Sequence, residues 1–151
     1  MGRLIEQLKK YKRIGLDTNT FIYLMEKHTE YYPICSEIFK QIEKGQFFGI
    51  TSVLLITEVL TKPIKDKNMG LVHAYRAAIN TFPNLAIKQI DNDICLFAAE
   101  LRAKYGLKTP DAIFLATAIE EGAEVFITND IRLRKIEEID FIILDEYMKE
   151  I

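Results

Sequence analysis

The residues Arg13-Ile14-Gly15-Leu16-Asp17-Thr18-Asn19-Thr20 decide the fold predicted for this chain. A short apolar run ends in an acid, and three small polar residues suited to a turn follow that acid. This pattern predicts a buried strand over residues 14–17 that delivers a carboxylate to the edge of a sheet, with a helix beginning just after it. Ligands of open α/β sheets bind outside the carboxyl ends of the strands, so Asp17 is predicted to lie where chemistry tends to occur.

Short apolar runs alternate with helical patterns along the rest of the chain. Further strands are predicted at residues 47–50, 85–90, 125–128 and 141–144. Thr51 and Ser52 are expected to cap a helix from residue 53 to about residue 61, which Pro63 then ends. Such alternation gives a mainly parallel sheet that helices cover on both faces. We therefore expect an α/β fold, a three-layer α/β/α sandwich with about five strands, in one domain over residues 1–151.

The composition is that of a folded protein with no membrane segment. Hydrophobic residues make up 49% and charged residues 28% of the 151 residues, which argues against disorder. No apolar run approaches the roughly 18 residues needed to cross a membrane, and the basic N-terminus lacks the apolar core of a signal peptide. We expect a cytoplasmic protein.

The charges and the cysteines leave most function classes open. The net charge of −2 does not indicate nucleic-acid binding, but acidic metal ligands would mask a basic surface. Residues 1–13 are basic and residues 137–151 acidic, so these ends either attract one another or form solvated faces. Cys35 and Cys95 are far apart, lack zinc-site spacing and are predicted to be small buried residues.

Glu58 is the second acid with a promising position. It follows Leu54 and Leu55 by four and three residues, so a helix places it on their apolar side. A carboxylate there is costly unless it is paired, protonated or bound to a cation. The alternative is a residue on the flank of the helix that reaches water and pairs with Lys62.

Asp111 and Asp130 complete a set of four acids. Thr109 and Pro110 suit the start of a helix, which puts Asp111 in its first turn, where an acid stabilises the helix dipole by roughly 0.3–1 kcal/mol without any other role. Asp130 follows an apolar strand and two small polar residues, as Asp17 does, although an ordinary turn also explains it. Two such strand ends in one parallel sheet bring their acids to the same edge.

Four carboxylates around one cleft repel each other and favour a divalent metal. Hard oxygen ligands suit Mg²⁺ or Mn²⁺, which keep several waters and accept phosphate oxygens. A metal in such a site activates water and stabilises charge on the attacked phosphate, and two ions about 3.5–4 Å apart act on both sides of the displacement. If the acids converge, the residues indicate a metal-assisted phosphodiester hydrolase.

Taken in order, Asp17-Thr18-Asn19, Glu58, Thr109-Pro110-Asp111-Ala112 and Thr128-Asn129-Asp130 resemble the motifs of the PIN-domain nuclease family. Leu115-Ala116-Thr117-Ala118 is also similar to the corresponding helix of VapC-type toxins. The resemblance covers nearly the whole chain. It implies an endoribonuclease that depends on Mg²⁺ or Mn²⁺. Many such relatives are toxins of toxin–antitoxin pairs and often dimeric, so RNA, a small antitoxin and a second copy of the chain are the implied partners.

The resemblance also implies a role for individual residues. Asp17, Glu58, Asp111 and Asp130 would be the catalytic and metal-binding acids, with Asn19 and Thr128 as polar companions that orient ligands or water. Relatives often carry another acid shortly after the last motif, whereas Ile131-Arg132-Leu133 follows here, which leaves the second metal position open and makes Arg132 a candidate for phosphate contact. Substrate phosphates are expected near Lys62, Lys65, Arg132 and Arg134, for which an ordinary solvated surface is the alternative.

Two other functions remain open at this point. A haloacid-dehalogenase-like phosphatase also begins with an aspartate at the end of a strand, but that family places a second acid two residues later, where this chain has Asn19. A PIN-like module that binds RNA or protein without catalysis is the other alternative. The four intact acids argue against it, since a scaffold has no need of them.

Overall fold

A parallel sheet forms the centre of the computed structural model, which describes residues 2–150. Within these residues the sheet has five strands in the order β3-β2-β1-β4-β5, and all neighbouring strands are parallel. The strands are β1 Arg13–Leu16, β2 Phe48–Ser52, β3 Leu85–Lys88, β4 Val125–Thr128 and β5 Asp140–Ile143. Because β1 lies between β2 and β4, the carboxyl ends of these three strands are adjacent. The predicted α/β class and parallel sheet are confirmed.

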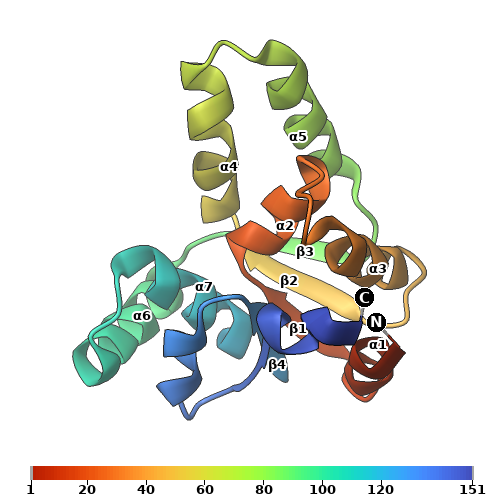
Figure 1. The fold of residues 1–151 in the computed structure, drawn as a ribbon. Coiled ribbons are helices and arrows are strands. Elements are labelled where there is room, and N and C mark those ends of the chain that lie inside the picture. Colours follow the sequence, from red (N-terminus) through yellow and green to blue (C-terminus); the bar gives the residue numbers. More distant parts are fainter. Residues whose placement is uncertain (1, 151) are drawn as a thin grey trace.

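Helices cover both faces of this sheet (Figure 1). They are α1 Gly2–Leu8, α2 Thr18–Met25, α3 Tyr32–Glu43, α4 Leu54–Lys65, α5 Met69–Thr81, α6 Asn92–Tyr105 and α7 Thr109–Glu120, with short 3-10 helices η1 Ile131–Lys135 and η2 Leu144–Glu150. On one face α7 approaches β1 so closely that a Cβ on Gly15 would lie 2.7 Å from Cβ of Ala118. On the other face, a Cβ on Gly49 would lie 3.1 Å from Cδ1 of Ile42 in α3. These contacts make the three layers.

The helix pair α4 and α5 projects from the body, at the top of Figure 1. The prediction that Pro63 ends α4 near residue 61 is wrong, since α4 continues to Lys65. Proline leaves the carbonyl four residues earlier without its helical partner. Here Pro63 is buried on the same stripe as Leu55 and Val59, and this packing offsets the missing bond. Thr51 and Ser52 end β2, and the Ser52 hydroxyl also accepts the N–H of Leu54, the first residue of α4, at 3.1 Å.

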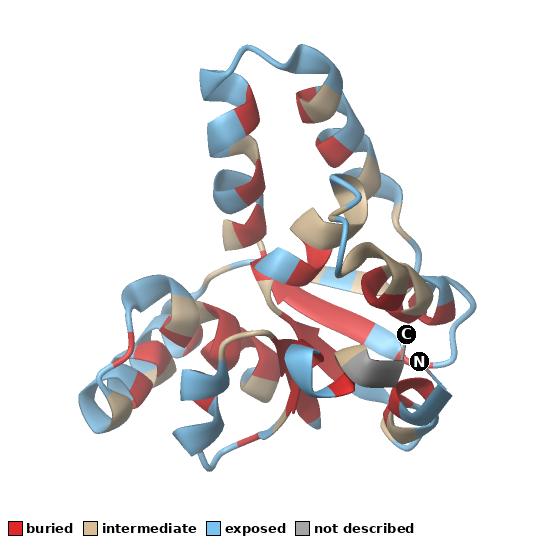
Figure 2. Cartoon of the chain, viewed as in Figure 1, coloured by how far each residue is buried: buried red, intermediate tan, exposed pale blue. Residues whose placement is uncertain are grey.

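Burial is concentrated on the central strands and on the helix faces turned toward them (Figure 2). All four residues of β4 are buried, as expected for a strand covered on both sides. Cys35 is buried as predicted, and burial raises the pKa of its thiol to about 12. Cys95 is exposed, contrary to the prediction, because α6 turns Ile94, Ala98 and Leu101 inward and leaves residue 95 on its outer side.

The two ends of the chain lie side by side (Figure 1). The helices α1 and η2 contact each other, and the guanidinium carbon of Arg3 lies 4.6 Å from the ring centroid of Tyr147. The hydroxyl of Tyr147 also donates to Gln7. The two ends are therefore in contact through the ring and the hydroxyl of Tyr147. Within residues 2–150, no helix is both long enough and apolar enough to cross a membrane.

Candidate functional site

Asp17 lies at the turn between β1 and α2. Its backbone is extended, with φ −78° and ψ 155°, and its Oδ1 accepts the N–H of Thr18 at 2.8 Å, so the carboxylate caps α2. The N–H of Asp17 donates to the carbonyl of Ile127 at 3.1 Å, which continues the pairing between β1 and β4. The strand thus ends with the carboxylate at the carboxyl edge of the sheet, as the sequence predicts.

Thr128, at the end of β4, connects Asp17 to Asp130. Its hydroxyl donates to Oδ2 of Asp17 at 2.6 Å and accepts the N–H of Asp130 at 3.1 Å. The residue is fully buried, so water does not compete for these bonds. The two strand-end acids are therefore held on either side of one hydroxyl.

Thr18 connects Asp17 to Glu58 in a similar way. Its hydroxyl donates to Oε1 of Glu58 at 2.6 Å. Glu58 itself is exposed on α4, which agrees with the alternative of a flank residue, but the expected pair with Lys62 is absent because Lys62 lies 3.6 Å from Asp66 instead. Sequence reasoning missed Thr18, which reads as an ordinary turn residue. Only the fold brings the residue after Asp17 against α4.

Asp111 lies in the first turn of α7, beside Asp130. Both acids line a small cavity of about 120 Å³ whose walls also include three cations, Lys108, Arg132 and Lys135. The helix begins after Lys108, whose backbone is extended and whose side chain makes no capping hydrogen bond. Asp111 therefore has the dipole position that the sequence predicts and also faces another acid.

The pKa values of these acids reflect their shared surroundings. Burial raises the pKa of Asp17 to about 6; the hydrogen bonds from Thr128 and Thr18 oppose this rise, and the charges of Asp111 and Glu58 add to it. Burial also raises the pKa of Asp111, and the charge of Asp130 raises it further. Asp17 thus senses the charges of Asp111 and Glu58, and Asp111 senses the charge of Asp130.

Asp130 differs from the other acids because it is already paired. Arg132 donates through Nε to Oδ1 at 2.9 Å and through Nη2 to Oδ2 at 2.8 Å. These hydrogen bonds hold the pKa of Asp130 below its ordinary value. The cation follows the last motif at the place where relatives often carry an acid.

The carboxylates are suitable ligands for a divalent metal, but their present arrangement does not form a complete metal site. Carboxylate oxygens are the donors that Mg²⁺ and Mn²⁺ prefer, and the raised pKa of Asp17 reflects negative charge that its surroundings leave partly uncompensated. Across residues 2–150, however, no three acidic, histidine or cysteine side chains are grouped closely enough to hold an ion. Oδ2 of Asp17 accepts the Thr128 hydroxyl, Oε1 of Glu58 accepts the Thr18 hydroxyl, and Arg132 occupies both oxygens of Asp130. A complete metal site requires these side chains to move.

The remaining predicted residues lie outside this group of acids. Asn19 is exposed on α2, and within the described part of the chain no hydrogen bond joins its side chain to any of the four acids. Lys62 and Lys65 follow Glu58 by about one and two turns along α4, and both are exposed. Arg134 is paired with Glu146 of η2.

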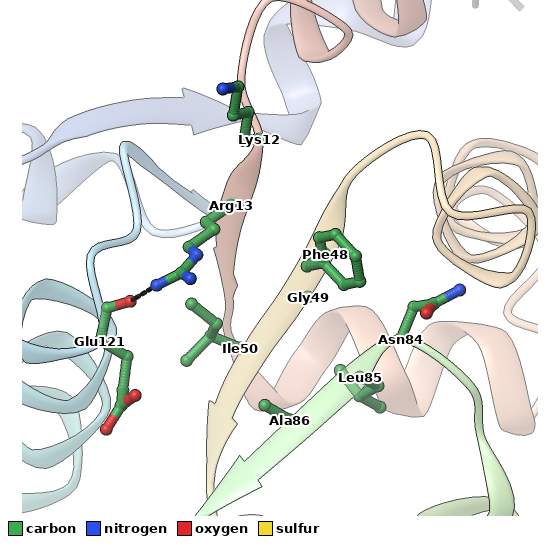
Figure 3. A pocket seen from close by; sticks show the side chains of 9 residues that line it. All are labelled: Lys12, Arg13, Phe48, Gly49, Ile50, Asn84, Leu85, Ala86 and Glu121. Atoms are coloured by element: carbon green, nitrogen blue, oxygen red, sulfur yellow. Dashed lines mark hydrogen bonds between the residues drawn. The ribbon is translucent and has the colours of Figure 1, made fainter.

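A larger cavity lies elsewhere, on the sheet face beside the end of α7 (Figure 3). It measures about 540 Å³ and contains none of the predicted site residues. Arg13, Phe48 and Leu85, the first residues of β1, β2 and β3, line it. Because these residues begin their strands, the cavity lies toward the opposite end of the strands from Asp17 and Thr128. Size alone therefore does not mark the site here, and the smaller cavity at Asp111 and Asp130 remains the candidate.

Comparisons with solved structures give the same fold. A toxin–antitoxin complex from Klebsiella pneumoniae is 27% identical, with 85% of this chain and 95% of that chain covered and a TM-score of 0.61. VapBC from Salmonella typhimurium, crystallised with DNA, is 19% identical, with 87% and 96% covered and a TM-score of 0.64. VapBC2 from Rickettsia felis, bound to a promoter DNA fragment, is 19% identical, with 86% and 97% covered and a TM-score of 0.62. No curated protein sequence matches this chain.

A match of the sequence to a family profile identifies the family. The profile described as PIN domain matches residues 14–139, which span β1 to the residue before β5 and include all four acids. This match supersedes the phosphatase alternative, and it agrees with the parallel sheet and with acids placed at the ends of β1 and β4. The chain belongs to the PIN domain family.

Proposed function

We propose that this protein is a metal-dependent endoribonuclease that hydrolyses RNA phosphodiester bonds. The observation that carries the proposal is the placement of Asp17, Asp111 and Asp130 along one sheet edge in a member of the PIN domain family. A nuclease acts on a polyanion. Acidic side chains in contact with RNA therefore require a cation between the carboxylates and the phosphates. We place the activity in the cytoplasm.

In this proposal Asp17, Asp111 and Asp130 hold Mg²⁺ or Mn²⁺, with Glu58 close by. When bound, the metal activates water and stabilises the charge that develops on the phosphate. Thr128 and Thr18 orient the carboxylates of Asp17 and Glu58 through their hydroxyls. Lys108, Arg132 and Lys135, which line the same cavity, attract the RNA backbone.

We further propose that the nuclease is the toxin of a toxin–antitoxin pair. Support comes from the complex of Klebsiella pneumoniae, whose matched chain is 27% identical and is described as part of a toxin–antitoxin assembly. A small antitoxin is then the expected protein partner, and a homodimer is the expected assembly. Co-expression with the product of a neighbouring small gene, followed by co-purification, tests the antitoxin, and sedimentation tests the dimer.

Cleavage of RNA by purified protein tests the catalytic proposal. We expect end-labelled single-stranded RNA to be cut with Mg²⁺ or Mn²⁺ and to remain intact with a chelator. Asp17→Asn should abolish cutting, while Asp66→Asn, which removes an exposed acid of the Lys62 pair, serves as the matched control. Undiminished cleavage by Asp17→Asn would refute the catalytic role.

A non-catalytic binding module is the second candidate, because no metal-holding group is assembled within the described residues. Calorimetric titration with Mn²⁺ separates the two candidates. Binding that Asp17→Asn weakens supports the nuclease. RNA binding without any Mn²⁺ binding supports the module.

A further inference from the structure

Arg132 fills the place that a metal would need at Asp130. Its guanidinium contacts both carboxylate oxygens at 2.9 and 2.8 Å, and its backbone N–H donates to Oδ1 at 3.0 Å. Paired contacts of this kind are the strong form of an arginine–carboxylate bond. The oxygens of Asp130 are therefore occupied by a cation from the chain itself.

Arg132 is also free to leave this position. Its side chain is 75% exposed, against 27% for Asp130, and within residues 2–150 the guanidinium is bonded to Asp130 alone. The neighbouring cations Lys108 and Lys135 line the same cavity and form no salt bridge in the described part of the chain. A phosphodiester drawn to these lysines arrives next to Arg132 and offers it two oxygens in place of the carboxylate.

We propose that Arg132 is an internal counter-ion that competes with the divalent metal for Asp130 and moves to an RNA phosphate when substrate binds. This inference rests on the proposed function and concerns the order in which the site is loaded. Metal binding releases Arg132 for RNA, and RNA binding releases Asp130 for metal. The two ligands therefore assist each other, and the assistance is equal in both directions because binding free energies are linked. Arg132 acts through Asp130 and is a positioning residue.

The first test is the affinity of RNA-free protein for Mn²⁺, measured by calorimetry. Arg132→Gln should bind Mn²⁺ about fivefold more tightly than the wild type, because an exposed ion pair worth about 1 kcal/mol no longer competes. Two matched controls remove one positive charge nearby: Arg134→Gln, whose partner is Glu146, and Lys135→Gln, in the wall of the same cavity. Both should stay within about twofold of the wild type, since screening weakens charges that make no contact.

The second test is the coupling between metal and RNA. A short phosphorothioate oligoribonucleotide, which resists hydrolysis, should tighten Mn²⁺ binding to the wild type after the oligonucleotide's own Mn²⁺ uptake is subtracted. This effect should disappear in Arg132→Gln. Arg132→Lys keeps the charge without the two-pronged contact and should fall between the two.

The outcomes separate this inference from the proposed function. Equal or weaker Mn²⁺ binding by both Arg132→Gln and Arg132→Lys overturns the role of Arg132 and leaves a metal-dependent nuclease intact. Failure of every variant and of the wild type to bind Mn²⁺ overturns both. Circular dichroism checks that each variant is folded, and a lower melting temperature without any change in Mn²⁺ affinity shows a purely structural arginine, which also overturns the inference.

Discussion

Among single residues, Asp17 is a carboxylate whose charged form burial disfavours, and this predicts how stability changes with pH. Its pKa rises from 3.8 to about 6, so between these values the folded protein binds more protons at this group than the unfolded chain does. The destabilising contribution of Asp17 is therefore absent below pH 3.8 and complete above pH 6.

Asp17→Asn should accordingly stabilise the metal-free protein above pH 7, by about 1–3 kcal/mol, and have little effect near pH 4. Denaturant unfolding in chelator across this pH range measures the difference. Asp66→Asn should show no such dependence. If Asp17→Asn destabilises the protein equally at both pH values, its carboxylate is not held in an unfavourable charged state.

Thr128 is the residue whose hydroxyl serves two acids, so its removal should be costly. Thr128→Val leaves Oδ2 of Asp17 and the N–H of Asp130 without their partner, which should lower the free energy of unfolding by about 1–3 kcal/mol. Thr128→Ser keeps the hydroxyl and should recover most of the loss. Urea unfolding of both variants gives the comparison, and a Thr128→Val protein as stable as the wild type would show that the hydroxyl does not stabilise the fold.

For single residues, the sequence predicts where a side chain lies better than it predicts the hydrogen-bond partners of that side chain. Asp17 and Asp130 could be placed because each follows a short apolar run, and Asp111 because Thr109 and Pro110 begin a helix. The hydroxyl of Thr18 on Glu58 and the pairing of Arg132 with Asp130 could not be predicted. Both depend on side-chain rotamers and on how closely two elements approach, which spacing along the chain does not determine.

Among the elements, α7 and β1 approach each other closely, and Gly15 permits this approach. A Cβ at this position would lie 2.7 Å from Ala118 and from Phe126, so Gly15→Ala should push α7 away and cost about 1–3 kcal/mol. Gly70→Ala in α5 is the control, because its Cβ would meet nothing closer than 3.8 Å and alanine favours a helix. Chemical unfolding measures both. Equal stability of the two variants would mean that α7 does not rest on β1 as described.

Two adjacent phenylalanines, Phe47 just before β2 and Phe48 at its start, differ in burial. Phe47 is 1% exposed, whereas Phe48 is 49% exposed and lines the cavity on the sheet face beside the end of α7 (Figure 3). Phe47→Ala should cost about 3–5 kcal/mol, and Phe48→Ala should cost less than about 1 kcal/mol. Thermal and urea unfolding compare them. A large loss from Phe48→Ala would show that another surface covers this face in solution.

Element boundaries follow from the sequence where its local pattern agrees with the packing. The strand β4 has the bounds predicted for it, since its three apolar residues follow a glutamate and lead into the polar Thr128 and Asn129. The predicted end of α4 was wrong because the burial of Pro63 outweighs the helical hydrogen bond that proline cannot donate. The helix η2 was missed altogether, as a short 3-10 helix has no periodicity to detect and here depends on contact with α1. That the chain forms one domain stays a prediction.

For the molecule as a whole, Tyr147 ties the last element to the first. Its ring is buried, it packs under Arg3, and its hydroxyl donates to Gln7. Tyr147→Ala should lower the free energy of unfolding by about 2–4 kcal/mol, and Tyr147→Phe by about 0.5–1.5 kcal/mol. Hydrogen exchange should also become faster in α1 of the alanine variant. Unchanged exchange in α1 would show that the two ends are stable independently.

The two thiols differ in accessibility, so the native protein can be labelled at a single cysteine. Cys35 is sealed in the core with its pKa raised to about 12, so it stays protonated and out of reach, whereas Cys95 faces solvent on α6. A maleimide fluorophore should therefore attach once to the folded protein and twice to the unfolded chain, a difference that mass spectrometry counts directly. Metal and RNA binding can then be followed by fluorescence at a single known position, without first removing a cysteine.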